Sequence, residues 1–329
     1  MRYRHYQNAN VDVSVMGLGC WGMGGGQDYQ NNRFGDSSED DCIRVIDTLL
    51  ENGVNLFDTA PAYGDGNSER VLGRALEGKR AKAFISTKFG IPIVDREFTN
   101  DAQYESALRQ CEQSLKNLRT DYIDFYFLHD PDPATPIEET MRAFETLKRQ
   151  GKIRFVGVSN FTVEQLAEAL QYGVIDVIEP AFSLVDQVQM PILTYAAERG
   201  IDTITYGSLS GGVLSGAYRT LPSFDRIDIR GDFYSVYFTE PVFSRIQELF
   251  VTLDEIAAAY GRPVAQVVIN YTTQQPFVST ALIGAHNVRK AEQNLAAFEF
   301  MLTDAELARI TAEAKRLKLD TLSPFWRAD

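Results

Sequence analysis

The sequence predicts an α/β protein folded as a closed (β/α)8 TIM barrel, with an N-terminal extension, a long loop after strand 7 and an extra C-terminal helix. Short apolar runs alternate with amphipathic segments of helical length along all 329 residues. Eight such runs occur, and no linker rich in Pro, Gly or Ser divides them, so we expect a single domain over residues 1–329. An open doubly wound sheet has the same alternation, but the count of eight favours the barrel.

The apolar runs are expected to be the barrel strands, beginning near Val15, Asn55, Phe84, Tyr122, Arg154, Val177, Asp202 and Ser279. Each of the first six intervals has room for one crossover helix, which neighbouring parallel strands require. The seventh interval is longer: an irregular stretch over residues 207–241 precedes helical patterns at 242–259 and 263–274.

Helix starts are expected where a hydroxyl side chain precedes an acid or amide by about three residues, because the hydroxyl can accept from the free backbone N–H groups. Four places fit this pattern: Ser38 with Asp41, Thr135 with Pro136 and Glu138, Thr162 with Gln165, and Thr303 with Glu306. The last of these would open the extra C-terminal helix.

Composition excludes several classes of function. The formal net charge of −13 disfavours binding to nucleic acid or anionic membranes. No apolar run is long enough to span a membrane, and the N-terminus lacks the apolar stretch of a signal peptide. Cys20, Cys42 and Cys111 have no metal-binding spacing, and an odd count suits reduced thiols in the cytoplasm. With only three histidines, no metal site is expected.

The segment Gly17–Gly22 satisfies the dinucleotide-binding pattern G-x-G-x-x-G. That pattern binds a pyrophosphate only if a helix opens immediately after it. Here further glycines and polar residues follow as far as Gly35, so we reject a Rossmann fold. We expect instead a glycine-rich loop close to a ligand, with Trp21 as an apolar wall.

Polar side chains end four successive strands: Asp58, Lys88, His129 and Asn160. In a barrel the carboxyl ends of the strands converge, so these groups would meet in one pocket. Tyr63 follows the second strand closely.

These residue types support proton transfer. A free tyrosine has a pKa of about 10 and is a weak acid at neutral pH. The ammonium of Lys88 would stabilise the phenolate of Tyr63 and lower this pKa, and Asp58 would keep Lys88 charged. Tyr63 would then be a general acid, and His129 would orient a substrate carbonyl. A proton relay supplies no electron pair, so a hydride-donating cofactor is implied.

The segments 58–64, 86–88, 128–132 and 157–161, read in this order, resemble the signatures of the aldo-keto reductase superfamily and suggest a bacterial member. The resemblance covers nearly the whole chain. It implies a (β/α)8 barrel that reduces aldehydes and ketones with NAD(P)H, without metal or flavin. It also implies that Asp58, Tyr63, Lys88 and His129 form the catalytic tetrad.

The resemblance further implies the cofactor-binding residues. Ser159 and Asn160, with Glu179, would meet the nicotinamide carboxamide, and Tyr206 would stack on the nicotinamide ring. The pyrophosphate would lie on a loop that includes Gly207, Ser208, Leu209 and Gly211. The adenosine end would contact Gly284, His286, Arg289, Lys290, Gln293 and Asn294.

Cations at a helix start suit a phosphate monoester, which favours NADPH over NADH, with NADH as the alternative. Three residues depart from the family pattern. Glu179 replaces the usual glutamine, and an ionised carboxylate accepts but does not donate. Gln293 stands where glutamate is common, and Lys290 replaces an arginine that would bind phosphate with two donors.

The strand-end loops are expected to wall the substrate pocket, through Trp21, Phe89, Trp326 and the aromatic residues Phe233, Tyr234, Tyr237 and Phe238. Asp130 and Asp132 near the mouth disfavour anionic substrates. The partner would be a small carbonyl compound or sugar. Three functions stay open: a carbonyl reductase, which we favour, an NAD(P)-linked sugar or alcohol dehydrogenase, and a cofactor-binding regulatory subunit.

Overall fold

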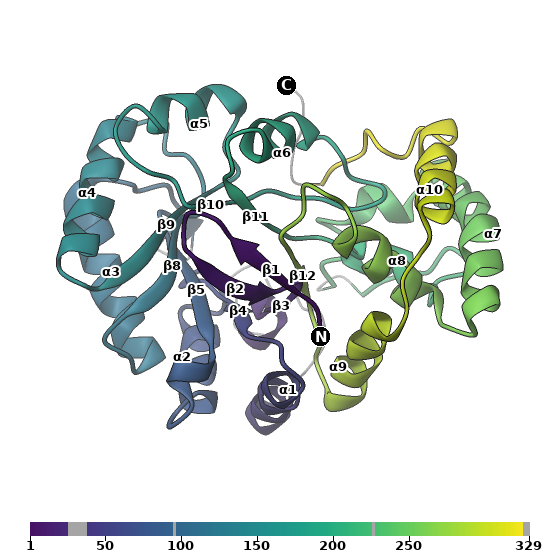
Figure 1. Cartoon of the computed structure of the whole chain (residues 1–329), viewed down its shortest axis with the longest axis horizontal. Coiled ribbons are helices and arrows are strands. Elements are labelled where there is room, and N and C mark those ends of the chain that lie inside the picture. Colours follow the sequence, from purple (N-terminus) through teal and green to yellow (C-terminus); the bar gives the residue numbers. More distant parts are fainter. Residues whose placement is uncertain (26–37, 95–96, 226–227, 325–329) are drawn as a thin grey trace.

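A computed structural model describes residues 1–25, 38–94, 97–225 and 228–324, and its centre is a closed barrel of eight parallel strands (Figure 1). The strands in chain order are β3 (Met16–Gly19), β4 (Leu56–Asp58), β5 (Phe84–Phe89), β8 (Ile123–Leu128), β9 (Ile153–Ser159), β10 (Val177–Glu179), β11 (Asp202–Thr205) and β12 (Thr280–Ile283). Ala281 of β12 pairs with Met16 of β3, and this pairing closes the ring. The predicted barrel is confirmed, and the open-sheet alternative is wrong.

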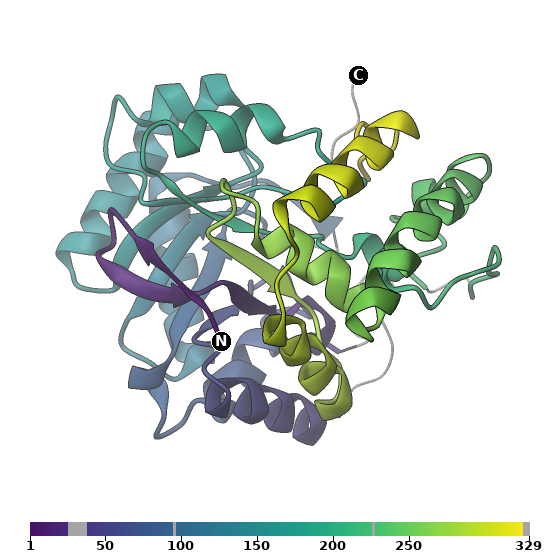
Figure 2. The same cartoon turned by 45° about the vertical axis from the view of Figure 1, so that its right-hand side comes forward.

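Helices surround the barrel as the alternating pattern predicts (Figure 1). One α-helix follows each of the first six strands: α1 (Glu39–Glu51), α2 (Asn67–Ala75), α3 (Tyr104–Leu118), α4 (Ile137–Arg149), α5 (Val163–Ala169) and α6 (Met190–Ala197). The long seventh interval holds α7 (Val242–Tyr260) and α8 (Val264–Thr273), and α9 (Val288–Leu295) and α10 (Asp304–Arg316) follow β12. Figure 2 shows α10 lying beside α7 and α8. None of the described helices is long and apolar enough to cross a membrane.

Three of the four predicted helix starts are confirmed. Ser38 accepts a hydrogen bond from the backbone of Asp41, and Thr162 and Thr303 each form a complete capping box. The start at Thr135 is wrong, because α4 begins after Pro136. The Thr135 hydroxyl donates instead to Asp132, 2.7 Å away, within the preceding loop.

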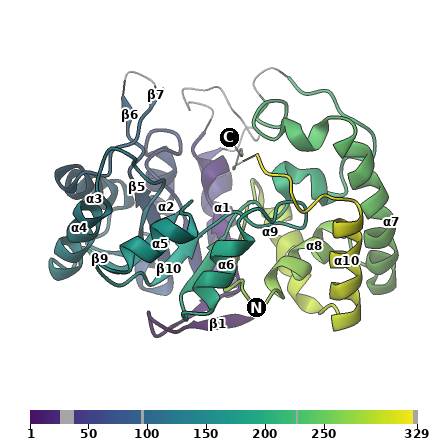
Figure 3. The same cartoon turned by 90° about the horizontal axis from the view of Figure 1, so that it is seen from above.

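The N-terminal extension is an antiparallel hairpin of β1 (Tyr3–Tyr6) and β2 (Val11–Ser14) that crosses one end of the barrel (Figure 1). Tyr6 is fully buried there, its hydroxyl donates to Thr280 Oγ1 at 2.8 Å, and its ring lies 5.8 Å from that of Phe125. A second hairpin, β6 (Ile93–Val94) and β7 (Glu97–Phe98), was not predicted. Figure 3 shows it at the end opposite β1.

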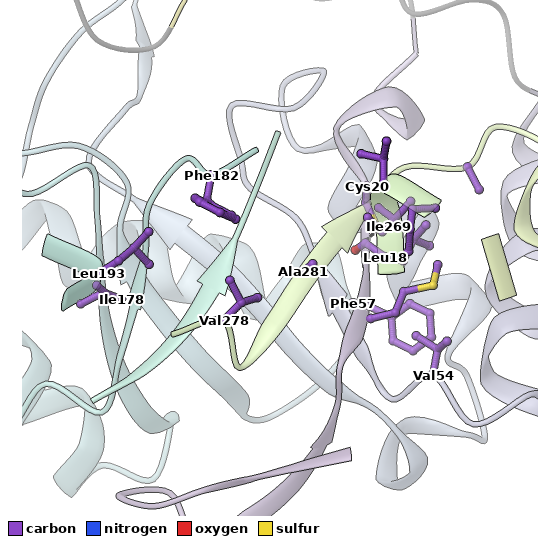
Figure 4. Close-up of a cluster of buried hydrophobic side chains, with 14 of the residues drawn as sticks. Leu18, Cys20, Val54, Phe57, Ile178, Phe182, Leu193, Ile269, Val278 and Ala281 are labelled. Atoms are coloured by element: carbon purple, nitrogen blue, oxygen red, sulfur yellow. Dashed lines mark hydrogen bonds between the residues drawn. The ribbon is translucent and has the colours of Figure 1, made fainter. Parts of the chain in front are cut away.

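Apolar side chains fill the space between the barrel and its helices (Figure 4). Leu18, Phe57 and Ile269 belong to this core and are fully buried. Within the barrel, a Cβ on Gly157 of β9 would lie 2.3 Å from the ring of Phe127, so only glycine fits opposite that phenylalanine. With one end closed by the hairpin and the wall packed, polar groups can converge only at the carboxyl ends of the strands.

Candidate active site

A buried ion pair joins the ends of β4 and β5, which are neighbours in the barrel. Lys88 Nζ donates to both carboxylate oxygens of Asp58 at 2.7 Å, and Ser86 Oγ donates to Asp58 Oδ2 at 2.8 Å. Lys88 is 1% exposed and Asp58 is 2% exposed. Burial alone would lower the pKa of Lys88, but the negative charge of Asp58, and that of Glu179 when it is ionised, outweigh burial and raise that pKa. Lys88 is therefore a permanent cation in this pocket.

Tyr63 lies in the turn after β4, with Lys88 Nζ 5.3 Å from its ring centre. Burial raises the pKa of Tyr63, and the ammonium of Lys88 and its hydrogen bond to the phenol work in the opposite direction. The predicted decrease in the pKa of Tyr63 is therefore wrong for the protein alone, because burial and the negative charge of Asp58, with that of Glu179 when it is ionised, outweigh Lys88. A raised pKa keeps the phenol protonated, which a proton donor requires.

His129 follows β8 and faces Tyr63. Their ring centres are 5.9 Å apart and the ring planes are nearly perpendicular. Burial and the nearby Lys88 hold the pKa of His129 well below its usual value. The imidazole is therefore neutral at neutral pH and keeps one N–H donor that could meet a carbonyl oxygen.

Glu179 ends β10 and lies against the same ammonium ion. Its Oε1 is 3.2 Å from Lys88 Nζ, and the residue is 2% exposed. Burial and the negative charge of Asp58 raise the pKa of Glu179 well above the usual value. The resemblance implies that Glu179 meets the nicotinamide; the structure shows its carboxyl against Lys88, beside the Asp58 carboxylate.

Asn160 connects the ends of three strands. Its Nδ2 donates to the carbonyl of His129 at 3.1 Å, and its Oδ1 accepts from the Tyr206 hydroxyl at 2.6 Å. Its φ of 59° is left-handed, a conformation that asparagine tolerates better than most residues. Ser159 donates its hydroxyl to the carbonyl of Glu179 at 2.8 Å. Both predicted carboxamide partners thus also hold the rim of the barrel together.

The residues after β11 and β12 fit a nicotinamide dinucleotide. Gly207 and Gly211 have φ values of 81° and 65°. The predicted pyrophosphate loop therefore adopts left-handed backbone conformations that residues with a side chain disfavour. By contrast, a Cβ on Gly19 would meet nothing closer than 3.7 Å, and one on Gly284 nothing closer than 4.0 Å. The packing of the protein does not demand glycine at these two positions. The open space beside them leaves room for a ligand to approach the protein backbone closely.

The start of α9 carries the predicted basic cluster. His286 and Arg289 are exposed and Lys290 is half-buried. Burial lowers the pKa of His286, and Lys290, Arg230 and Arg289 lower it further. Arg230 was missed from the sequence, because it lies in the long irregular stretch. Its guanidinium Nε donates to Asp228 Oδ1 at 2.7 Å, so part of its charge is already balanced.

The two remaining adenosine-end residues behave differently. Asn294 is buried, and its Nδ2 donates to the carbonyl of Gly284 at 3.2 Å. It therefore fixes the predicted loop against α9. Gln293 is exposed beside it. On the other side of the cofactor loop, Ser208 is buried and donates to the carbonyl of Leu282 at 3.4 Å, and Leu209 is half-buried.

Aromatic rings stand next to the tetrad, but not all those predicted. Trp21 lies 6.2 Å from the ring of Tyr63 and 6.2 Å from that of Phe233. Phe89 does not wall the pocket: it is 1% exposed and stacks on Tyr126 in the outer core. Side chains alternate along a strand, so when Lys88 points into the barrel Phe89 must point outwards.

Of the other predicted wall residues, Tyr234, Tyr237 and Phe238 are buried and pack among other aromatic rings. Trp326 lies outside the described residues. Asp130 is half-buried at the mouth, and burial raises its pKa to about 6. Asp132 accepts from backbone N–H groups of Ala102 and Ala134 and so supports the loop.

The geometry agrees with what comparison with known proteins shows. A family model described as "Aldo/keto reductase family" matches residues 15–315. Aldo-keto reductase YhdN of Bacillus subtilis is 34% identical over 89% of this chain and 87% of its own length. The NADH-specific methylglyoxal reductase of Escherichia coli is 31% identical over 93% of this chain and 96% of its own length.

Similarity to solved structures extends to the whole fold. The glycerol dehydrogenase AKR11B4 from Gluconobacter oxydans superposes with a TM-score of 0.86 at 30% identity, and the match covers 97% of each chain. The chain therefore belongs to the aldo/keto reductase family and is an oxidoreductase that reduces carbonyl compounds with NAD(P)H.

Proposed function

We propose that Tyr63 is the general acid of carbonyl reduction and that Asp58, Lys88 and His129 complete its site. The observation that carries this proposal is the position of Lys88 Nζ, buried between the Asp58 carboxylate at 2.7 Å and the ring of Tyr63. A nicotinamide held by Ser159, Asn160 and Tyr206 would supply the hydride for the carbonyl carbon. Tyr63 gives its proton to the carbonyl oxygen, and solvent later returns a proton to the phenolate.

Each remaining group has one task in this scheme. Lys88 stabilises the phenolate that Tyr63 becomes. Asp58 holds Lys88 charged and in place. Neutral His129 donates a hydrogen bond to the carbonyl oxygen and so orients it toward Tyr63. The oxidation of an alcohol uses the same groups in reverse, so a dehydrogenase of sugars or alcohols is the second candidate.

We assign NADPH as the preferred cofactor, with NADH as the alternative. His286, Arg289 and Lys290 gather at the start of α9, where the helix dipole and the free N–H groups favour an anion. A 2′-phosphate would meet these cations. The relative from Escherichia coli is named as NADH-specific, which is why NADH is kept as the alternative.

The substrate is a small carbonyl compound with an apolar face. Trp21 offers aromatic surface beside Tyr63, Phe233 packs edge-on against Trp21, and Asp130 disfavours an anionic group above its pKa of about 6. Binding to nucleic acid or membranes is not part of this proposal. We place the protein in the cytoplasm, because Cys20, Cys42 and Cys111 are unpaired thiols.

The deciding experiment is Tyr63→Phe, which removes the proton and keeps the ring. Aldehydes, ketones and sugars are tested with NADPH and NADH in both directions. We expect the variant to lose about 10²- to 10⁴-fold in turnover, while NADPH binding, measured by fluorescence, stays within a few-fold of wild type. A variant that reduces aldehydes at nearly the parental rate would overturn the assignment. Cofactor binding by wild type without turnover of any substrate would favour the regulatory-subunit alternative.

A further inference from the structure

Lys88 is flanked by two buried carboxyl groups, and the proposed mechanism uses only one of them. Asp58 accepts two hydrogen bonds from Lys88 Nζ at 2.7 Å and a third from Ser86 Oγ at 2.8 Å. Glu179 approaches the same ammonium only at 3.2 Å, through Oε1. Its Oε2 is buried and has no hydrogen-bond partner among the described residues.

These contacts decide where a proton would reside. Two ionised carboxylates beside one ammonium leave a net negative charge on side chains that are almost fully buried, and such pairs commonly hold a shared proton. Asp58 already has a full set of donors, so protonating it would lose strong hydrogen bonds. Glu179 has a free oxygen, so protonating it loses little.

We propose that Glu179 is an uncharged carboxylic acid at neutral pH, and that this proton keeps Tyr63 able to protonate the substrate oxygen. With Glu179 neutral, Lys88 is balanced by Asp58 and can also stabilise the phenolate of Tyr63. With Glu179 ionised, loss of the Tyr63 proton would add a further uncompensated negative charge. Glu179 thus acts through Lys88 and Tyr63 as a positioning residue, and this inference rests on the proposed role of Tyr63.

Among the described residues, the surroundings of Glu179 supply no second cation to change this balance. Charged and titratable groups that face it come from β4, the turn after β4, β5, the end of β11 and the N-terminal hairpin: Asp58, Tyr63, Lys88, Tyr206 and Tyr6. Of these groups in the described part of the chain, Lys88 alone is positively charged at neutral pH. The phenols of Tyr206 and Tyr6 are buried, and burial raises the pKa of each, so both stay neutral.

The first test needs no cofactor. Infrared spectra of the protein in D2O, recorded as a function of pH, separate the C=O stretch of an uncharged carboxylic acid from carboxylate bands. We expect wild type to retain such a band at neutral pH, and Glu179→Gln to lose it. Glu179→Met is a second uncharged variant of similar size, in case the amide disturbs folding. A matched control is Glu69→Gln, which removes a buried carboxyl bonded to Thr87 and Asn117 on another face of the barrel; it should retain the band that Glu179→Gln loses.

The second test is the pH profile of carbonyl reduction. As pH rises through the ionisation of Glu179, wild type should lose activity several-fold. Glu179→Gln has no proton to lose there, so its decrease should begin at higher pH, and Glu69→Gln should follow wild type. Identical infrared spectra of wild type and Glu179→Gln, or identical pH profiles, would overturn the proposal. Tyr63→Phe separates the two proposals: its retained activity would refute the general acid, while the infrared result would still report on Glu179.

Discussion

Lys88 has one of the most demanding positions in the molecule, because a charged side chain that is 1% exposed needs full compensation. Asp58 supplies it from the neighbouring strand, and the carbonyl of Thr59 accepts a third contact at 3.2 Å. Burying the ammonium of Lys88 costs desolvation free energy, and the burial occurs where the proposed chemistry needs a fixed positive charge. Rigid strand ends hold it, which a loop would do less well.

Lys290 tests the choice of cofactor at the scale of one residue. Lys290→Met keeps the length of the side chain and removes its charge. A charge-assisted hydrogen bond contributes about 1.5–3 kcal/mol, so we expect NADPH to bind roughly tenfold more weakly, and NADH to bind unchanged. Fluorescence titration with both cofactors measures this difference.

Lys315→Met provides the control, since Lys315 is an exposed cation in the last turn of α10. It should leave both affinities unchanged. An equal loss of NADPH and NADH affinity in Lys290→Met would mean that Lys290 does not recognise the 2′-phosphate.

Elements of the barrel follow from local rules to a large extent. The eight strand positions, the two helices before β12 and three of four helix starts were read from periodicity and capping residues alone. The exceptions are instructive. Thr135 has the right neighbours for a cap, but its hydroxyl is taken by Asp132 in a loop whose shape depends on tertiary contacts. The β6–β7 hairpin is too short to produce a periodic signal.

Gly157 in β9 tests how tightly the barrel interior is packed. In Gly157→Ala the new methyl group would lie 2.3 Å from the ring of Phe127, so the ring or the strand must move. Overpacking of this kind costs about 1–3 kcal/mol. Urea unfolding followed by circular dichroism should show that decrease in the free energy of unfolding.

Gly284→Ala is the matched substitution for this measurement, because its methyl group would find open space. Its stability should equal that of wild type, whereas its affinity for the dinucleotide should fall if the open space holds the cofactor. Equal stability of Gly157→Ala and wild type would contradict the packing described above.

At the scale of the whole molecule, the chain after α10 returns to the barrel at Asp186. Ser323 Oγ donates to Asp186 Oδ2 at 2.7 Å, and Gln187 donates its backbone N–H to the carbonyl of Asp320 at 3.1 Å. Asp186 is 2% exposed, and burial raises its pKa to about 6. The attachment of the C-terminal segment is therefore coupled to a titrating group.

The sign of this coupling can be predicted. Between the usual aspartate pKa of about 3.9 and the raised value, the folded state binds more protons than the unfolded state, so stability falls as pH rises. Asp186→Asn cannot titrate and lacks this loss. We expect the free energy of unfolding of Asp186→Asn, relative to wild type, to increase by about 2 kcal/mol between pH 4 and pH 7.

Urea unfolding at a series of pH values measures this change. The relative stability of the two proteins at a single pH also contains the altered contacts of the amide, so only the change with pH is diagnostic. A pH-independent difference would show that Asp186 ionises in the folded protein as it does in the unfolded chain.

The sequence alone determined the barrel, the order of its elements and the polar residues Asp58, Lys88, His129 and Asn160 at successive strand ends, because periodicity, capping residues and polar strand ends are local features of the chain. Tertiary structure decided what lies across the barrel from each strand end. Phe89 packs in the outer core and not in the pocket, and Arg230 lies near the start of α9. Glu179 lies against Lys88. Such proximities depend on the register of strands and the course of long loops, and no local pattern encodes the distance between two residues some 90 positions apart.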